Sequence, residues 1–579
     1  MKMKLPKALL CAVLASSMAY AGGTYRPNTI IKVEDGSIKA QAYIVDADST
    51  ALDALTKSQC GTNDVPEAWV KDGQGVLNID TSTTTTVDGE EVVVPSATPT
   101  KVYNTIMVRE GTVNISNTSI QNYNGLSNGV SNLVVGGKNA VLNLDNAHYE
   151  QRIEFASNYG SSVNIGSGDG SGTVNLTNRS TLHSDHCIFI GRVNTTYKGM
   201  AAYVQPSYAG TTGDTLYTYV ENPPTSVVNI SGASKMSTGT QIYLDNVTVN
   251  IGGPGSEMLA AERAINEPNT YFYGSYMGSV TGAQATVNVT EGGAFTMMRD
   301  FYTGTAADAT STVNVSGNGS TMTVHGDTYL GLGTYNYSTK AYESNSSTTS
   351  VKVSDNATLK LGDSDFVIGY LAQSSVEIGK TAKIEEIGSD KNANIYIDEL
   401  GSLTNSGTIE AEIGVEGGIF TMTDDAVAAG LTATAGTINL SGDVTFTGEV
   451  RLGGLSLLTD DETTPALTIN ITQGTTLIFE NQVALSNAVI NVLLSDNEVS
   501  EGETLFTIAS VDGKALDALN QAAVTFEHGG IDVTETVKAA NANVGLNASY
   551  VTNTTIPEPT TATLSLLALM GLAARRRRK

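Results

Sequence analysis

The chain has 579 residues, of which only 16% are charged, and it carries a formal net charge of −27 with a sequence pI near 4.5. Such an acidic chain repels phosphates, which argues against a nucleic-acid-binding function. Charged residues make up about 25% of ordinary domains, whereas this chain has 59 glycines, 6% aromatic residues and 40% hydrophobic residues. The composition therefore indicates a soluble, exported polypeptide that can bury a core. No P-loop or dinucleotide-binding signature is visible in the sequence, so we expect no cofactor.

Residues 1–21 are predicted to be a secretory signal peptide. Three lysines stand among the first seven residues, an apolar stretch covers residues 8–14, and Ala19 and Ala21 frame a small-x-small cleavage site. We therefore expect signal peptidase and the general secretion machinery to act on this chain, and the mature protein to begin near Gly22.

Residues 22–70 are predicted to form an N-terminal cap, because their hydrophobic pattern is mixed and they contain the lone tryptophan, Trp69. After signal removal, Cys60 and Cys187 are the remaining cysteines. These two cysteines could pair in an oxidising compartment, but one pair does not make a disulfide scaffold.

Residues 71–550 are predicted to be a repeat built on a triad of apolar residue, asparagine and apolar residue. Neighbouring side chains of a strand point to opposite faces, so the two aliphatic residues face inward and the asparagine faces outward. The outward asparagines could form ladders between stacked repeats. The central asparagines are Asn78, Asn114, Asn143, Asn164, Asn175, Asn229, Asn250, Asn288, Asn314, Asn439, Asn470 and Asn491.

A second landmark follows the triad at a nearly constant distance. Gly191 lies 16 residues after Asn175, and Gly331 lies 17 residues after Asn314. Strand, polar turn, strand and glycine-bearing turn predict an all-β fold, a right-handed parallel β-helix or β-solenoid rod. Two stretches of helical character, Ser256–Ile265 and Leu516–Ala523, are expected to be short helical insertions, and the signal and tail segments to be flexible.

The repeat resembles a known family. Residues 312–331 are similar to the strand–loop–strand repeats of autotransporter passenger domains, and residues 71–79 with 108–115 resemble the passenger-associated transport repeat of the same proteins. The resemblance implies an exported β-solenoid over residues 71–550.

The last segment, residues 556–579, has three ordered parts. Pro557-Glu558-Pro559 is followed by a 13-residue apolar run from Ala562 to Ala574, shorter than the roughly 20 residues that span a bilayer. The basic end that follows would be held at an anionic cytoplasmic lipid face. It consists of Arg575, Arg576, Arg577, Arg578 and Lys579.

This arrangement closely resembles the PEP-CTERM sorting signal of Gram-negative bacteria. The resemblance implies processing by an exosortase-type enzyme in the membrane. We therefore expect the protein to cross the inner membrane, to associate with it transiently through its C-terminus, and to reach the cell envelope, the outer surface or the extracellular space.

The best candidate for metal chemistry is the segment from His183 to Cys187. His183, Asp185 and His186 could supply ligands to zinc or copper. However, Cys187 occupies the turn position that Asp327 has in a sister repeat, and alternation along a strand would separate His186 from Cys187. We therefore expect no metal site here.

Two functions remain open. The first is a non-enzymatic structural or adhesion protein of the cell surface, whose polar face could bind glycans, neighbouring cells or an extracellular matrix. The second is a secreted carbohydrate-active β-helix enzyme, a polysaccharide lyase or glycosidase using carboxylates such as Asp363 and Asp365. No cluster of aromatic or basic residues that would rim a catalytic cleft is visible in the sequence, so we expect no enzymatic activity.

Overall fold

The computed structural model describes residues 26–32, 38–45, 67–71, 75–80, 82–87, 90–94, 99–102, 105–108, 110–123, 133–137, 139–152, 162–166, 170–191, 225–266, 274–453, 467–485, 488–495, 503–510, 523–534, 537 and 551–555. The chain divides into two compact units, Met1–Ser374 with Ile387–Lys391, and Ser375–Glu386 with Asn392–Lys579. We call them unit 1 and unit 2. Each unit is built almost entirely of parallel β-strands, which confirms the predicted all-β solenoid class.

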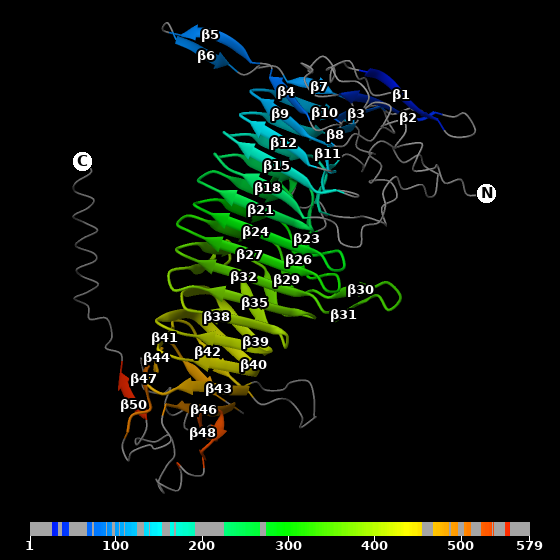
Figure 1. The fold of residues 1–579 in the computed structure, drawn as a ribbon. Helices are drawn as coiled ribbons and strands as arrows, with labels where there is room; N and C mark the ends of the chain where they lie inside the picture. Colours follow the sequence, from blue (N-terminus) through cyan, green and yellow to red (C-terminus); the bar gives the residue numbers. More distant parts are fainter. Residues whose placement is uncertain are drawn as a thin grey trace. The chain divides into compact units, whose positions relative to one another are not determined.

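A coil of unit 1 consists of three short strands, as one complete turn illustrates. β24 (Gln284–Thr290) is followed by β25 (Ala294–Met297) and β26 (Phe301–Thr303), and β27 (Thr310–Ser316) then lies parallel to β24 and begins the next coil (Figure 1). Successive coils place each strand beside its counterpart at the spacing of about 4.8 Å usual for paired strands. Unit 1 therefore has three stacks of parallel strands.

The first stack contains the asparagine triads, and neighbouring strands pair in register. Its members are β4 (Val76–Asp80), β9 (Thr112–Ser116), β12 (Ala140–Asp145), β15 (Gly172–Thr177), β18 (Ser226–Ile230), β21 (Val247–Gly252), β24, β27 and β32 (Thr348–Ser354).

The second stack follows the first across a polar turn in each coil. Its members are β7 (Thr100–Val102), β10 (Ser119–Tyr123), β13 (His148–Arg152), β16 (Thr181–Ser184), β19 (Lys235–Thr238), β22 (Glu257–Ala260), β25, β28 (Thr321–Val324) and β33 (Thr358–Leu361).

The third stack carries the glycine landmark. Its members are β2 (Ile38–Val45), β3 (Glu67–Lys71), β8 (Thr105–Val108), β11 (Leu133–Val135), β14 (Val163–Ile165), β17 (Ile188–Ile190), β20 (Ile242–Leu244), β23 (Ser275–Met277), β26, β29 (Thr328–Leu330) and β34 (Asp365–Ile368). β1 (Arg26–Lys32) pairs antiparallel with β2 in the region predicted as the cap.

The core of unit 1 is formed by the inward residues of all three stacks. Val287 and Val289, which flank Asn288, are completely buried, as are Phe295 and Phe301 on the next two faces of the same coil. Outward residues of the first stack are half-buried or exposed. This alternation is the one that the apolar-Asn-apolar triad predicts.

The glycine landmark closes most of the later coils of unit 1 with a left-handed backbone, as at Gly191, Gly278, Gly304, Gly331 and Gly369. Gly331 has a φ of 75°, and an added Cβ would lie 2.4 Å from the carbonyl oxygen of Ala372. Both the backbone conformation and the close approach require glycine at this position. Gly191 meets the same condition against the carbonyl oxygen of Asn246.

Two predictions need correction in unit 1. Asn164 belongs to β14 of the third stack, where it pairs with Val134 and Phe189, and not to the asparagine stack. The first part of Ser256–Ile265 is strand and not helix, because β22 pairs with β19 and β25 and overrides the helix-forming tendency of its residues. A single turn, α3 (Arg263–Asn266), follows.

Unit 2 uses the same principle with longer strands. β39 (Thr408–Met422) runs beside three short strands in turn, and β40 (Ala426–Leu440) lies parallel to β39, with register irregularities where the strands bend. Gly417 (φ 137°) and Gly436 (φ 100°) lie at one bend. Of the predicted insertion Leu516–Ala523, only Ala523 lies within the described residues, at the start of β48.

The other strands of unit 2 continue this stacking. They are β36 (Lys383–Glu386), β37 (Asn394–Ile397), β38 (Gly401–Asn405), β41 (Asp443–Phe446), β42 (Val450–Leu452), β43 (Leu467–Thr472), β44 (Thr476–Phe479), β45 (Val483–Leu485), β46 (Ala488–Leu494), β47 (Phe506–Ser510), β48 (Ala523–His528), β49 (Ile531–Asp532) and β50 (Val551–Thr555). β35 (Gln373–Ile378) begins in unit 1 and ends in unit 2.

Two antiparallel hairpins leave the coils of unit 1. β5 (Thr83–Val87) pairs with β6 (Glu90–Val94), and β30 (Thr334–Asn336) pairs with β31 (Ala341–Glu343). Both project from the stacked strands in Figure 1.

Candidate functional site

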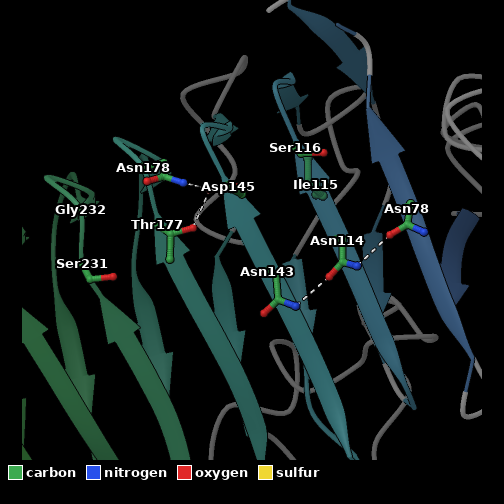
Figure 2. A pocket seen from close by; sticks show the side chains of 10 residues that line it. All are labelled: Asn78, Asn114, Ile115, Ser116, Asn143, Asp145, Thr177, Asn178, Ser231 and Gly232. Atoms are coloured by element: carbon green, nitrogen blue, oxygen red, sulfur yellow. Dashed lines mark hydrogen bonds between the residues drawn. The ribbon is translucent and has the colours of Figure 1, made fainter. Parts of the chain in front are cut away.

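The outward asparagines of the first stack form a hydrogen-bonded ladder. Asn114 Nδ2 donates to Asn78 Oδ1 over 2.8 Å, and Asn143 Nδ2 donates to Asn114 Oδ1 over 2.7 Å (Figure 2). The same bond links each later asparagine to its predecessor as far as Asn314, at 2.7–3.0 Å. Each amide donates toward the preceding coil, so the amide dipoles are aligned along the stack.

A second ladder of this kind lies in unit 2. Asn470 donates to Asn439 over 2.7 Å, and Asn491 donates to Asn470 over 3.1 Å. Asn439 also donates to Thr421, and Asn491 to the carboxylate of Glu527. The ladders confirm the expectation that the triads stack in register.

An open groove of about 610 Å³ lies over the first five strands of the asparagine stack. Besides the ladder asparagines Asn78, Asn114 and Asn143, the groove is lined by residues that include Asp145, Thr177 and Asn178. Asp145 Oδ1 accepts hydrogen bonds from both Thr177 and Asn178 of the next coil. Many polar groups of this groove therefore bond to one another.

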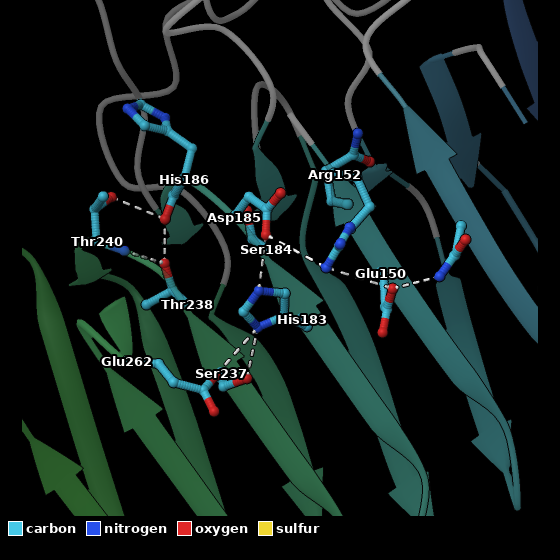
Figure 3. A network of polar contacts seen from close by, with 12 residues as sticks. Glu150, Arg152, His183, Ser184, Asp185, His186, Ser237, Thr238, Thr240 and Glu262 are labelled. Carbon is cyan, nitrogen blue, oxygen red and sulfur yellow. Dashed lines mark hydrogen bonds and ion pairs between the residues drawn. The ribbon is translucent and has the colours of Figure 1, made fainter. Parts of the chain in front are cut away.

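The sequence-predicted residues His183 and Asp185 meet in a charged network on the second stack (Figure 3). His183 Nε2 lies 3.1 Å from Asp185 Oδ1, and His183 Nδ1 lies 3.4 Å from Glu262 Oε2. Lys235 Nζ forms an ion pair with Glu262 at 2.9 Å. Sequence reasoning did not find Glu262 or Lys235, because they come from later coils.

The network continues toward the preceding coils. The guanidinium of Arg152 lies 3.9 Å from Asp185 and 3.7 Å from Glu150, and Gln121 donates to Glu150 over 2.9 Å. Opposite charges thus alternate across neighbouring strands, which favours parallel stacking by cross-strand attraction.

His183 is held in its charged form. Burial lowers the pKa of the imidazole, but the hydrogen bonds to Asp185 and Glu262 outweigh it and raise the pKa to about 9. The hydrogen bond from His183 and the nearby Lys235 lower the pKa of Glu262 to about 2. A protonated imidazole has no lone pair to offer, so in this charged form His183 accepts no proton and coordinates no metal.

His186 does not join His183. Its ring points away from the network in Figure 3, and its carbonyl oxygen accepts hydrogen bonds from Thr238 and Thr240. Burial and the charge of Arg263 lower the pKa of His186 to about 4. The candidate ligands His183, Asp185 and His186 therefore do not converge. Across the described part of the chain, no three His, Cys, Asp or Glu side chains come close enough together to hold a metal ion.

Cys187 lies at the turn position that the sequence indicated. Strand register aligns it with Gln241, Gly274, Asp300, Asp327 and Asp365 in later coils. Its side chain is buried, and Sγ lies 3.3 Å from Thr240 Oγ1. Cys60 lies outside the described residues, so a pairing of the two cysteines stays a prediction.

Of the two carboxylates proposed for an enzyme, that of Asp363 accepts a hydrogen bond from the following coil. Its donor is the backbone nitrogen of Asp390, at 3.2 Å. The backbone nitrogen of Asp365 donates to the carboxylate of Asp327 over 3.2 Å, and that of Asp327 to Asp300 over 3.1 Å. The carboxylates of Asp300, Asp327 and Asp363 thus each bond to the backbone of the following coil.

An aromatic column lies on the outer face of the third stack. Phe189 stacks on Tyr243 with ring centroids 4.9 Å apart, and Tyr243 stacks on Tyr276 at 5.1 Å. Tyr302 and Tyr329 extend the column at 5.2 and 6.0 Å. Sequence reasoning missed this cluster, although a signal exists: an aromatic residue lies two residues before the landmark position in each of these coils.

In two coils of the column the tyrosine hydroxyl bonds to an acceptor two residues earlier in the chain. Tyr243 donates to Gln241 over 3.1 Å and Tyr302 donates to Asp300 over 2.8 Å. Burial, followed by the Asp300 carboxylate, raises the pKa of Tyr302 far above its ordinary value. The column therefore combines stacked rings with the amide of Gln241 and the carboxylate of Asp300.

The terminal signals cannot be located in the structure. Ala19 and Ala21, the motif Pro557-Glu558-Pro559 and the arginines 575–578 lie outside the described residues. Within the described ranges, no helix has the length and apolarity that crossing a bilayer requires.

Comparison with known proteins identified no relative of this chain. No protein-family model, no curated protein and no solved structure matches this chain.

Proposed function

We propose that the chain is an exported structural or adhesion protein of the cell envelope, directed there by its terminal signals. The observation that carries this proposal is the asparagine ladder, in which outward polar groups bond to the next coil. A surface built this way reinforces a stack mechanically, and it leaves few polar groups preset for chemistry on a substrate.

The sequences of the two chain ends support export to the cell envelope. A signal peptide at residues 1–21 engages the general secretion machinery and signal peptidase, and the tail at 556–579 presents Pro557-Glu558-Pro559 to an exosortase-type enzyme. The low charge fraction and the net charge of −27 suit an exported, soluble body. The final location on this proposal is the outer surface or the extracellular matrix.

Replacing Pro557-Glu558-Pro559 by three alanines tests the route. The variant is expected to remain unprocessed in the membrane, as measured by fractionation and by the intact mass of the C-terminus. The matched control replaces the adjacent pair Thr560 and Thr561 by alanine and should be processed normally. Unchanged surface display of the triple-alanine variant would show that the motif is incidental.

A carbohydrate-active enzyme is the second candidate, favoured by the aromatic column beside Asp300 and Asp327. Against it stands the engagement of the Asp363 and Asp327 carboxylates in hydrogen bonds to backbone nitrogens of the following coil. A panel of polysaccharides assayed for new reducing or unsaturated ends decides between the two. Activity that is lost in the D363N/D365N variant would replace the structural proposal.

A further inference from the structure

Four tyrosines are exposed together on unit 1. Tyr335 is 37%, Tyr342 42%, Tyr370 43% and Tyr337 86% exposed. Three of them belong to the β30–β31 hairpin, and Tyr370 follows β34. We call these four residues the tyrosine cluster. Exposed aromatic clusters on soluble proteins mark binding surfaces more often than scattered apolar residues do.

The cluster continues the aromatic column. Tyr329, the last ring of the column, lies 5.6 Å from Tyr370 in an edge-to-face contact. The backbone nitrogen of Asn345, two residues after the end of β31, donates to the carbonyl oxygen of Leu371 over 3.3 Å, so the base of the hairpin lies beside the segment that carries Tyr370. The rings therefore form one aromatic tract running from the third stack onto the hairpin.

The ring orientation changes along this tract. Tyr243 and Tyr276 are stacked with planes only 6° apart, so their faces are covered by each other. Tyr335 is nearly perpendicular to Tyr337, at 87°, and tilted by 66° from Tyr342, its cross-strand partner. An edge-to-face contact covers one ring face only in part, and Tyr337 is 86% exposed, so the cluster, unlike the column, can receive a flat ligand.

The hairpin is held in place before any ligand arrives. Asn336 Nδ2 donates to Glu343 Oε1 over 2.7 Å, and Asn336 Oδ1 accepts from the backbone of Ser338 over 2.8 Å. At its base, Asn345 Nδ2 donates to Thr334 Oγ1 over 3.1 Å and to the carbonyl of Gly304 over 3.0 Å. A surface fixed in this way loses little conformational entropy when it binds.

Polar groups beside the rings define the ligand chemistry. Glu343 and Asn336 lie on the hairpin, Asp327 lies two residues before Tyr329, and Asp365 has the same register position on the next coil. Carboxylates and amides accept hydrogen bonds from hydroxyl groups, and aromatic faces attract the C–H face of a pyranose ring. This combination fits a polysaccharide.

Charge and size narrow the class of ligand that the tyrosine cluster can bind. Carboxylates beside the rings and a net charge of −27 over the whole chain repel uronate or sulfated polymers. Strands of three residues present too little surface for a stable protein interface, which buries about 800 Å² on each partner. We infer that the tyrosine cluster binds an uncharged polysaccharide, which gives the proposed surface protein a specific glycan ligand.

Binding of purified full-length chain to soluble polymers tests the inference. Laminarin, dextran and hydroxyethylcellulose serve as neutral probes and polygalacturonate as the acidic probe, in affinity electrophoresis and calorimetry. Wild type is expected to bind at least one neutral polymer and not polygalacturonate. The Y335A/Y337A variant should bind on the order of tenfold more weakly, since two exposed ring contacts are lost.

Two control variants keep the result interpretable. Y337F retains the ring and should keep most of the affinity, and I265A removes an apolar residue that is 55% exposed on α3 and should change nothing. Circular dichroism of every variant should match wild type, because the altered side chains are exposed.

Three results overturn the inference: no binding to any neutral polymer, equal binding by Y335A/Y337A and wild type, or preferential binding of polygalacturonate. Retention of a protein partner through the same tyrosines would replace the glycan by a protein ligand. Because binding is measured on purified protein, it can fail while Pro557-Glu558-Pro559 still directs sorting, and sorting can fail while binding persists.

Discussion

Removal of one ladder amide should destabilise the coils on both sides of it. Asn250 Nδ2 donates to Asn229 over 2.8 Å, and Asn250 Oδ1 accepts from Asn288 over 2.9 Å. Each such bond contributes about 0.5–1.5 kcal/mol net, so N250A loses about 1–3 kcal/mol. The position is half-buried, and water recovers part of this loss, which favours the lower half of the range.

Native-state hydrogen exchange is the appropriate assay, because stacked repeats open locally and need not unfold in one step. Amides of β18, β21 and β24 should exchange about tenfold faster in N250A, since 1.4 kcal/mol corresponds to a factor of ten. The neighbours Val249 and Ile251 are completely buried, so they hold the strand in place. The coils therefore cannot shift to close the gap that the missing amide leaves in the ladder.

Asn78 provides the matched control. It is exposed and has one ladder bond, accepted from Asn114 over 2.8 Å, so N78A should have less than half the effect. N250D should be worse than N250A at neutral pH, because a carboxylate oxygen would face the acceptor oxygen of Asn229. Equal exchange rates in N250A and wild type would refute the view that the ladder stabilises the stack.

Further predictions concern a turn glycine, a charged histidine and metal content. G331A should lose about 2–4 kcal/mol of unfolding free energy, because it combines left-handed strain with a backbone clash. G253A should lose only about 1 kcal/mol, because Gly253 has a φ of 86° but nothing lies within 4 Å of an added Cβ. Equal losses of the two variants in thermal unfolding would exclude the clash. The pKa of His183 is raised to about 9, so its stabilisation is complete below the ordinary value of 6.5 and is lost as pH rises through 9. The difference in Tm between wild type and H183Q should therefore shrink between pH 7 and pH 10, and a constant difference would contradict the charged assignment. Elemental analysis of the mature protein should find no stoichiometric zinc, and a tight one-to-one content would restore His183, Asp185 and His186 as ligands.

The repeat grammar was predictable because its causes are local. Inward aliphatic residues around an outward Asn288 follow from strand alternation, and Gly331 marks a turn that no other residue fits. Asn164 was assigned to the wrong stack because Val163-Asn164-Ile165 imitates the triad. Ile165-Gly166 is the landmark pair, and this pair identifies the third stack.

Contacts between coils could not be predicted from one strand at a time. Glu262 reaches His183 from a coil 79 residues later in the chain, across a segment whose length no local pattern sets. The aromatic column likewise depends on register, since Tyr243 and Tyr276 meet only when β20 and β23 align. The strand β22 shows the reverse case, in which pairing overrides the local preference of Glu257–Ala260.

In-register stacking of coils is the central claim, and engineered disulfides test it most directly. Thr248 pairs with Thr286 on the next coil, and Thr286 pairs with Thr312 on the coil after that. In a background with Cys60 and Cys187 replaced by serine, T248C/T286C should cross-link on mild oxidation, because paired strands place the two Cα atoms about 4.8 Å apart. T248C/T312C, at about twice that distance, should not form the bond. Equal cross-linking of both pairs, or none in T248C/T286C, would contradict the stacked solenoid.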